Sequence, residues 1–182
     1  MKTSVTKFLD DLKVDYTVKP HQKEAFTSED AAHERGIRLS QIVKCMVGHD
    51  EHGNLYVMLI PGDRILKLKK VREVAGGVRI HLVPPDELVK TFGVTIGAIS
   101  PVQFYQKSKI FMDHTIFEED DVDISSGDLC AGIELKADKL CEILSAKRCD
   151  IVSTSHGSKV RLQQRQMLRE GYLFVSGIKG SF

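Results

Sequence analysis

The sequence predicts an α+β fold, a single domain in which a mixed central β-sheet is flanked by helices. Apolar β-rich runs and helix-period patterns alternate irregularly along the chain, and two of the runs are close enough to form a hairpin. The 182 residues suit one domain, and a hydrophobic content of 42% is sufficient for a buried core. We therefore expect residues 1–152 to form the domain and residues 153–182 to form a basic C-terminal extension.

The predicted strands are short runs of β-branched, aromatic and other apolar residues bounded by turn residues. They are expected at residues 16–18, 42–47, 55–60, 78–83, 110–113, 122–124 and 132–135, with a short edge strand at 151–152. Pro20 should stop the first of them. The polar segment 49–54 supplies the hairpin turn. We interpret His49 and His52 as turn residues rather than metal ligands, because a metal site needs ligands held by a rigid frame.

Helices are predicted where apolar residues recur at i, i+3, i+4 and i+7, or where capping residues mark both ends. They are expected over residues 4–13, between Thr27 and Gly36, from Leu66 to Gly76, from Pro84 to Gly93, and over residues 137–147. Ser4 is expected to cap the first helix. The second helix should open with a capping-box pattern of Thr27 and Asp30 and close at Gly36.

Charge is distributed unevenly along the chain. Residues 155–182 hold five basic residues and one acidic residue, a net charge of +4, which leaves −3 for the rest of a chain whose net charge is +1. A basic segment on a slightly acidic body suggests contact with a polyanion, and a solvated helix face is the alternative. Arg161, Arg165 and Arg169 would share one face if this segment were helical.

The cysteines and the hydropathy limit the class of protein. None of the four cysteines forms a Cys-x-x-Cys pair, so we interpret them as reduced thiols in a cytoplasm rather than as disulfides or zinc ligands. No apolar run approaches the roughly 20 residues that a membrane-spanning helix needs, and the amphipathic N-terminal pattern differs from a signal peptide. We expect no metal, no cofactor, and neither a membrane nor DNA as partner.

The segment from Gly93 to Pro101 is unusual because it places two glycines, a serine and a proline among apolar residues. Glycine permits sharp turns and a close approach of backbone to another group. A buried loop must also satisfy its N–H groups. They could bind a ligand oxygen, or they could bond internally in a connector between strands. The Gly-x-x-x-Gly pattern alone favours the connector.

Lys44 is the second unusual feature, since every neighbour of this lysine in the predicted strand 42–47 is apolar. A lysine is seldom fully buried without a partner. It could extend to solvent from an edge strand, or it could form a structural ion pair with Asp113. The functional interpretation is a cation placed in a cleft to meet an anion.

The order of these features resembles the YbaK-like family of aminoacyl-tRNA deacylases, which includes the editing domain inserted in bacterial prolyl-tRNA synthetases. The resemblance covers about residues 3–152. It rests on the family's strand lysine, matched by Lys44, and on the family's Gly-x-x-x-Pro loop, matched by Gly97-Ala98-Ile99-Ser100-Pro101. The order and spacing of the two motifs make the resemblance specific.

The resemblance implies hydrolysis of the ester between a wrongly attached amino acid and the 3′ end of a tRNA. Lys44 and Gly97 would be the catalytic residues, with Lys44 near the carbonyl and the terminal phosphate. The residues expected to shape the amino-acid pocket are Gly93, Ile99, Ser100 and Pro101. The residues expected to contact tRNA are Lys67, Lys69, Lys70, Arg72, Arg161, Arg165 and Arg169.

The function that follows is trans-editing, with Cys- or Ala-tRNA(Pro) as the expected substrate, no cofactor, and an aminoacyl-tRNA synthetase as a further partner. The alternative is a non-catalytic module of the same fold that binds tRNA or a synthetase. Its support is the segment 131–135, which has no acid where many family members carry an aspartate. Cys45 also replaces the Thr or Asn that often follows the family lysine.

Overall fold

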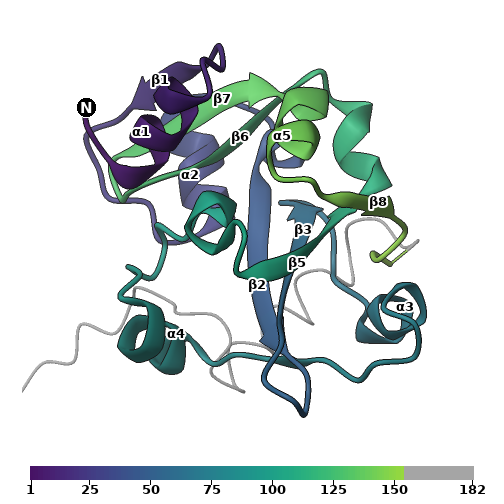
Figure 1. The fold of residues 1–182 in the computed structure, drawn as a ribbon. Helices are drawn as coiled ribbons and strands as arrows, with labels where there is room; N and C mark the ends of the chain where they lie inside the picture. The colour runs from purple at the N-terminus through teal and green to yellow at the C-terminus, as the bar shows by residue number, and fades with distance from the viewer. Residues whose placement is uncertain (154–182) are drawn as a thin grey trace, which may run out of the picture.

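The computed structural model describes residues 1–153 (Figure 1). The predicted extension, with Arg161, Arg165 and Arg169, lies outside the described residues. The predicted fold class is confirmed: helices surround a mixed sheet, and a second, smaller sheet packs beside it.

The larger sheet has five strands in the order β4-β2-β3-β5-β8. Their bounds are His81–Leu82 for β4, Val43–His49 for β2, Leu55–Pro61 for β3, Ser108–Asp113 for β5 and Lys147–Cys149 for β8. β2 pairs antiparallel with both β4 and β3, whereas β3–β5 and β5–β8 are parallel. This sheet is therefore the mixed sheet that the sequence predicted.

The smaller sheet is antiparallel, in the order β1-β7-β6. Its strands are Thr17–Pro20 for β1, Ala131–Lys136 for β7 and Asp121–Asp128 for β6. A single parallel bridge between Ile42 and Asp123 links it to the start of β2. This separate sheet was not predicted. β6 and β7 are neighbours in the sequence and pair antiparallel, but β1 lies far from them in the chain, and only the pairing distinguishes these strands from the central sheet.

The helices begin and end largely where the capping residues predict. Their bounds are Ser4–Asp11 for α1, Ser28–Arg35 for α2, Leu68–Val74 for α3, Pro85–Phe92 for α4 and Ala137–Ile143 for α5. Thr27 and Asp30 form the predicted capping box, and Gly36 ends α2 in the left-handed conformation with φ of 64°. Thr3, not Ser4, caps α1, because the Thr3 hydroxyl accepts the N–H of Thr6.

Several element boundaries differ from the sequence prediction. The edge strand expected at 151–152 is instead β8 at Lys147–Cys149, and Val152 forms only an isolated bridge with Leu66. The strand expected over 78–83 is reduced to β4, since β2 pairs with it only at Gly48 and His49. The helix expected over 137–147 ends at Ile143, and Ser145 then turns with φ of 48°. Pro20 is the last residue of β1 rather than a stop before it, which an edge strand tolerates.

Both faces of the five-stranded sheet are buried, and the register of β2 with β3 decides which residues share a face. Lys44 lies opposite Ile60, on the face that also packs Val71 of α3. Cys45 lies opposite Leu59, on the face that packs α1 and the smaller sheet. Since side chains alternate along a strand, consecutive residues of β2 reach two different cores.

Candidate functional site

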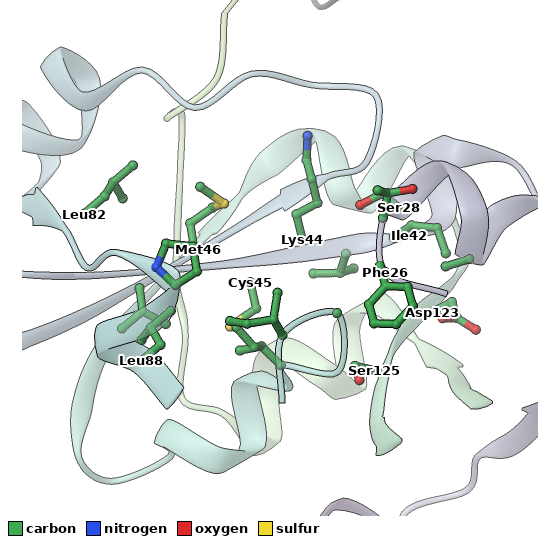
Figure 2. A pocket seen from close by; sticks show the side chains of 18 of the residues that line it. Phe26, Ser28, Ile42, Lys44, Cys45, Met46, Leu82, Leu88, Asp123 and Ser125 are labelled. Atoms are coloured by element: carbon green, nitrogen blue, oxygen red, sulfur yellow. The ribbon is translucent and has the colours of Figure 1, made fainter. Parts of the chain in front are cut away.

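A cavity of about 180 Å³ lies along the outer edge of β2 (Figure 2). Its walls come from α2 and the residues before it, from β2, from residues 82–88, from the loop at 96–99, and from β6. Lys44, Gly97 and Ile99 all line this cavity. The structure thus brings together the predicted strand lysine and the predicted glycine loop, which are more than fifty positions apart in the sequence.

The cavity exists because β2 has a gap in its outer pairing. The bridge from Ile42 to Asp123 closes one end of the gap. At the other end Val83 donates its N–H to the carbonyl of Val47, 2.9 Å away. Residues two apart in a strand direct their peptide groups to the same side, so the N–H and C=O of Cys45 face the gap. Lys44 and Cys45 then flank the gap from opposite faces of the strand (Figure 2).

Lys44 is a half-buried cation with a backbone partner. Its Nζ donates to the carbonyl of Arg64 at 2.6 Å. Burial lowers the pKa of Lys44 to about 8, and the nearby carboxylates of Glu29 and Asp63 partly oppose that shift. The ion pair with Asp113 considered as an alternative is wrong, because that carboxylate accepts hydrogen bonds from Thr115 and Ile151 instead. Lys44 therefore remains mostly protonated at neutral pH inside a poorly hydrated site.

Two backbone segments approach each other so closely at Gly97 that only glycine fits there. Its φ is 87°, and a Cβ at this position would lie 2.9 Å from the Cα of Phe26 and 3.0 Å from the carbonyl oxygen of Ala25. The loop therefore packs directly on the segment that leads into α2. The N–H of Ala98 bonds to Thr95 within the loop at 2.9 Å, as the connector interpretation expected, while Gly97 itself lines the cavity.

Of the other predicted pocket residues, one lines the cavity and three do not. Ile99 lines the cavity. Gly93 ends α4 in the left-handed conformation, and Ser100 and Pro101 begin the 3-10 turn Pro101–Phe104. None of these three is among the residues that line the cavity. They hold the loop between two short helical elements, so any effect on the pocket would pass through Gly97 and Ile99.

A buried ion pair that sequence reasoning missed also lines the cavity. Arg35 of α2 donates to Oδ1 of Asp123 on β6 at 2.5 Å, and the two side chains are only 5% and 1% exposed. Burial raises the pKa of Asp123 to about 6, although the Arg35 guanidinium opposes the shift. The available signal was Asp123 itself, an acid between two apolar residues of a predicted strand.

The same pair lies against Gly132, in the segment 131–135 where the resemblance led us to expect an aspartate. Gly132 lies beneath Asp123, and a Cβ on Gly132 would be 2.5 Å from Asp123 Oδ2. A carboxylate from the neighbouring strand β6 therefore occupies the space above Gly132.

Comparison with known proteins gives the family. Residues 22–153 match the family model described as the aminoacyl-tRNA editing domain. The chain belongs to this family. Part of the editing domain is 31% identical to the "Proline--tRNA ligase" of Fervidobacterium nodosum over 90 residues, which are 50% of this chain. The match spans only 15% of the length of that ligase.

Two further relatives cover most of the editing domain. It is 22% identical over 156 residues to the "Putative Cys-tRNA(Pro)/Cys-tRNA(Cys) deacylase EbsC" of Enterococcus faecalis, covering 84% of this chain and 94% of that protein. A crystal structure of a "putative trans-editing enzyme for prolyl tRNA synthetase" superposes with a TM-score of 0.72 at 22% identity, over 84% of this chain and 99% of that one. This second likeness supports the fold.

Cys45 contributes a wall of the site rather than a nucleophile. Its side chain lies on the face opposite Lys44, and burial raises the pKa of the thiol to about 12. The thiolate is the reactive form of cysteine. The editing domain therefore presents Cys45 to the cavity as a small, neutral group.

The basic residues around α3 lie outside the cavity lining. Lys67 precedes the helix, Lys69 is exposed, Lys70 pairs with Asp150 at 2.6 Å, and Arg72 donates to a backbone carbonyl at the end of the helix. The helix packs on the same sheet face as Lys44. A polyanion that contacted Lys44 from this face of the sheet would therefore also lie near α3, outside the cavity.

One group of side chains in the described residues has a spacing compatible with a metal ion. Ligand atoms of Asp113, His114 and Asp150 lie within 4.8 Å of one another. Asp113 already accepts three hydrogen bonds, and Asp150 already pairs with Lys70. These carboxylates therefore have protein partners, and none of the three residues lines the cavity along β2. Within residues 1–153, no helix combines the length and apolar character needed to cross a bilayer.

Proposed function

We propose that this editing domain hydrolyses the ester that joins a wrong amino acid to the 3′ end of a tRNA, acting in trans on Cys- or Ala-tRNA(Pro). The observation that carries the proposal is the shared cavity of Lys44 and Gly97, about 180 Å³ in volume, at the open edge of β2. The named relatives support the tRNA as substrate and the link with prolyl-tRNA synthetase.

Lys44 supplies the positive charge that ester hydrolysis needs. Attack on the carbonyl builds an oxyanion, and the leaving ribose oxygen lies near a phosphate, so negative charge develops where a fixed cation stabilises it. The interaction is stronger in a poorly hydrated site than in water. The peptide N–H of Cys45 faces the same gap and is a second donor for the oxyanion.

Attack is assigned to water or to a group of the substrate. The Cys45 thiol, with its pKa near 12, is not a nucleophile at neutral pH. The protein's contribution is then to hold the ester in a fixed position and to stabilise charge, which are large terms in catalysis.

The cavity would select the amino acid by size. Gly97 and Ile99 form one wall against β2, and the backbone contact at Gly97 fixes how far the loop stands from α2. A small pocket excludes a larger cognate amino acid and admits a smaller wrong one, which is the second sieve of editing. The wider partners would be the tRNA, held by Lys67, Lys69, Lys70 and Arg72 and by the C-terminal arginines, and a synthetase.

The test is deacylation of tRNA(Pro) charged with labelled cysteine or alanine. Wild type should release the amino acid, and Lys44→Ala should lose at least about 100-fold in rate, as expected when one charge-stabilising group is removed. Lys139→Ala is the matched control, since Lys139 pairs with Glu142 on α5 away from the cavity. Binding of tRNA(Pro) without hydrolysis by wild type would instead identify a non-catalytic binding module.

A further inference from the structure

The two faces of β2 give the cavity two different walls. Lys44 and Met46 extend from one face of the strand and Cys45 from the other, because side chains alternate along a strand (Figure 2). Leu82 of β4 is paired with Gly48, so it lies on the same face as Met46. Lys44, Met46 and Leu82 all line the cavity, and all three are partly exposed to solvent. This wall is therefore accessible to a ligand.

Met46 and Leu82 form an apolar surface beside Lys44. Figure 2 shows Met46 between Leu82 and Lys44. Both apolar side chains pack on the core cluster that contains Ile80, and a Cβ on Gly48 would lie 2.6 Å from Ile80 Cγ2. The missing side chain at Gly48 thus lets the segment of Leu82 pack closely on β2, which holds the apolar surface in place. A surface held in this way needs little further ordering when a ligand binds.

A nucleotide fits the spacing and the charge of these groups. Lys44 and Met46 are two residues apart in an extended strand, with roughly 7 Å between their Cα atoms. A nucleotide carries a negative phosphate and a flat base on one ribose. The lysine ammonium has three donors, of which one bonds to the carbonyl of Arg64. Charge complementarity therefore places the phosphate at Lys44 and the base on the apolar surface of Met46 and Leu82.

The other face of β2 suits the amino acid. Cys45 and Ile99 pack on the core cluster of that face, and Gly97 of the same loop lines the cavity with them. An ester held at the open edge of β2 would thus have its amino acid on the face of Cys45 and its nucleoside on the face of Lys44. The apolar surface is continuous with this gap, and the nucleoside that bears the ester in a tRNA is the terminal adenosine.

We propose that Met46 and Leu82 bind the adenine base of the terminal adenosine of the aminoacyl-tRNA, with Lys44 at the 5′-phosphate of that nucleotide. This inference rests on the proposed function, because it places the nucleoside of the same substrate. Proteins bind unpaired RNA bases largely through the flat face of the base, and the sulfur of methionine makes favourable contacts with rings. The contact adds affinity and orients the ester in the gap.

The first experiment observes the methionine methyl groups of the full chain by NMR, with adenosine 5′-monophosphate and ribose 5-phosphate as probes. The two probes share the ribose and the phosphate, and only the first has a base. The ring current of a base stacked on Met46 should shift the methyl signal of this residue, whereas ribose 5-phosphate should leave the signal nearly in place. Met46→Thr identifies the signal. Met58, which is paired with Met46 on β3 and fully buried, is the internal control.

Two outcomes of this experiment would overturn the inference. An equal response of Met46 to both probes would assign the binding to the phosphate alone. No response of Met46 to adenosine 5′-monophosphate would remove the base from this surface. The measurement does not depend on hydrolysis, so it separates the inference from the proposed function.

The second experiment measures kcat/KM for Cys- or Ala-tRNA(Pro), whichever wild type hydrolyses faster. Met46→Thr combined with Leu82→Thr removes the apolar ends and keeps β-branched side chains, which suit strands. The value should fall roughly 5- to 10-fold, as expected when a sulfur–ring contact and apolar contact area are lost. Leu55→Thr changes a partly exposed leucine of β3 outside the cavity lining and should have little effect. An equal kcat/KM in wild type and the double variant would overturn the inference, whereas failure of wild type to hydrolyse either substrate would overturn the proposed function itself.

Discussion

Gly132 lies so close to Asp123 that a Cβ on the glycine would be 2.5 Å from Asp123 Oδ2. It would also be 2.6 Å from the guanidinium carbon of Arg35. The absence of a side chain at Gly132 therefore leaves room on the smaller sheet for the ion pair between Arg35 of α2 and Asp123 of β6.

Gly132→Ala should lower the free energy of unfolding by roughly 2–4 kcal/mol, because it displaces a buried, hydrogen-bonded ion pair. Chemical denaturation measures the loss. In the background that combines Arg35→Met with Asp123→Leu, the same substitution should have a smaller effect, since the charged atoms that it meets are gone. A double-mutant cycle with no coupling would show that the clash does not involve the pair.

The pKa of Lys44 predicts an alkaline limit to activity. If protonated Lys44 stabilises the transition state, the deacylation rate above the spontaneous hydrolysis of the ester should fall as pH rises through about 8. Lys44→Arg should move the fall to higher pH, because arginine stays protonated, while Lys44→Ala should lack it. A wild-type rate that stays constant from pH 7 to 9 would exclude the charged lysine from the rate-limiting step.

The same group predicts how stability depends on pH. The folded pKa of Lys44 is about 8, below the ordinary value of 10.5, so between these values the unfolded chain holds a proton that the folded chain has lost. Stability rises with pH wherever the unfolded state binds more protons. The unfolding free energy of wild type should therefore rise relative to Lys44→Met from pH 8 to 10.5. Denaturation curves at a series of pH values measure this difference.

The contribution of Asp123 to stability should change with pH in the opposite direction, and in the acid range. Its folded pKa of about 6 lies above the ordinary value of 3.8, so the folded chain binds the extra proton between those values. The contribution of Asp123 to stability should then fall as pH rises from about 4 to 6. Asp123→Asn should abolish this part of the profile, and Asp121→Asn, at an exposed position on the same strand, should retain it. A wild-type unfolding free energy that does not fall relative to that of Asp123→Asn through this window would contradict the raised pKa.

Gly97→Ala should lower the stability of the fold and change the preference for the amino acid that is released. The left-handed φ of 87° and the contacts with Phe26 and Ala25 suggest a loss of about 1–3 kcal/mol in the free energy of unfolding. In the protein that does fold, a displaced loop should narrow the cavity and change the relative rates for cysteine, serine and alanine. An unchanged preference across these substrates in a well-folded variant would remove Gly97 from the pocket wall.

Local sequence patterns predicted most of the helices and strands. The features that were not predicted depend mostly on contacts between residues far apart in the sequence. Thr27, Gly36 and Gly93 were predicted as helix boundaries because capping is decided within a few residues. Arg35 and Asp123 are 88 positions apart, and no local pattern joins them. The division into two sheets likewise depends on which strands meet.

One missed residue could have been found. Lys44 was selected because it is a charged residue inside an apolar strand, and Asp123 has the same property between Val122 and Ile124. Applied to both positions, that criterion would have selected a cation and an anion of the same cavity. Gly93, Ser100 and Pro101 show the opposite case, since motif residues can support a loop without reaching its cavity.

The gap along β2 also bears on how the protein avoids self-association. An unpaired strand edge is a template on which another chain can add a strand, and proteins usually blunt such edges. Here the bridge at Ile42 and the hydrogen bond at Val47 leave only a few residues open, and the loop containing Gly97 stands beside them. An intermolecular strand would find too short a ladder to join. The gap that forms the cavity is thus too short to serve as a template for aggregation.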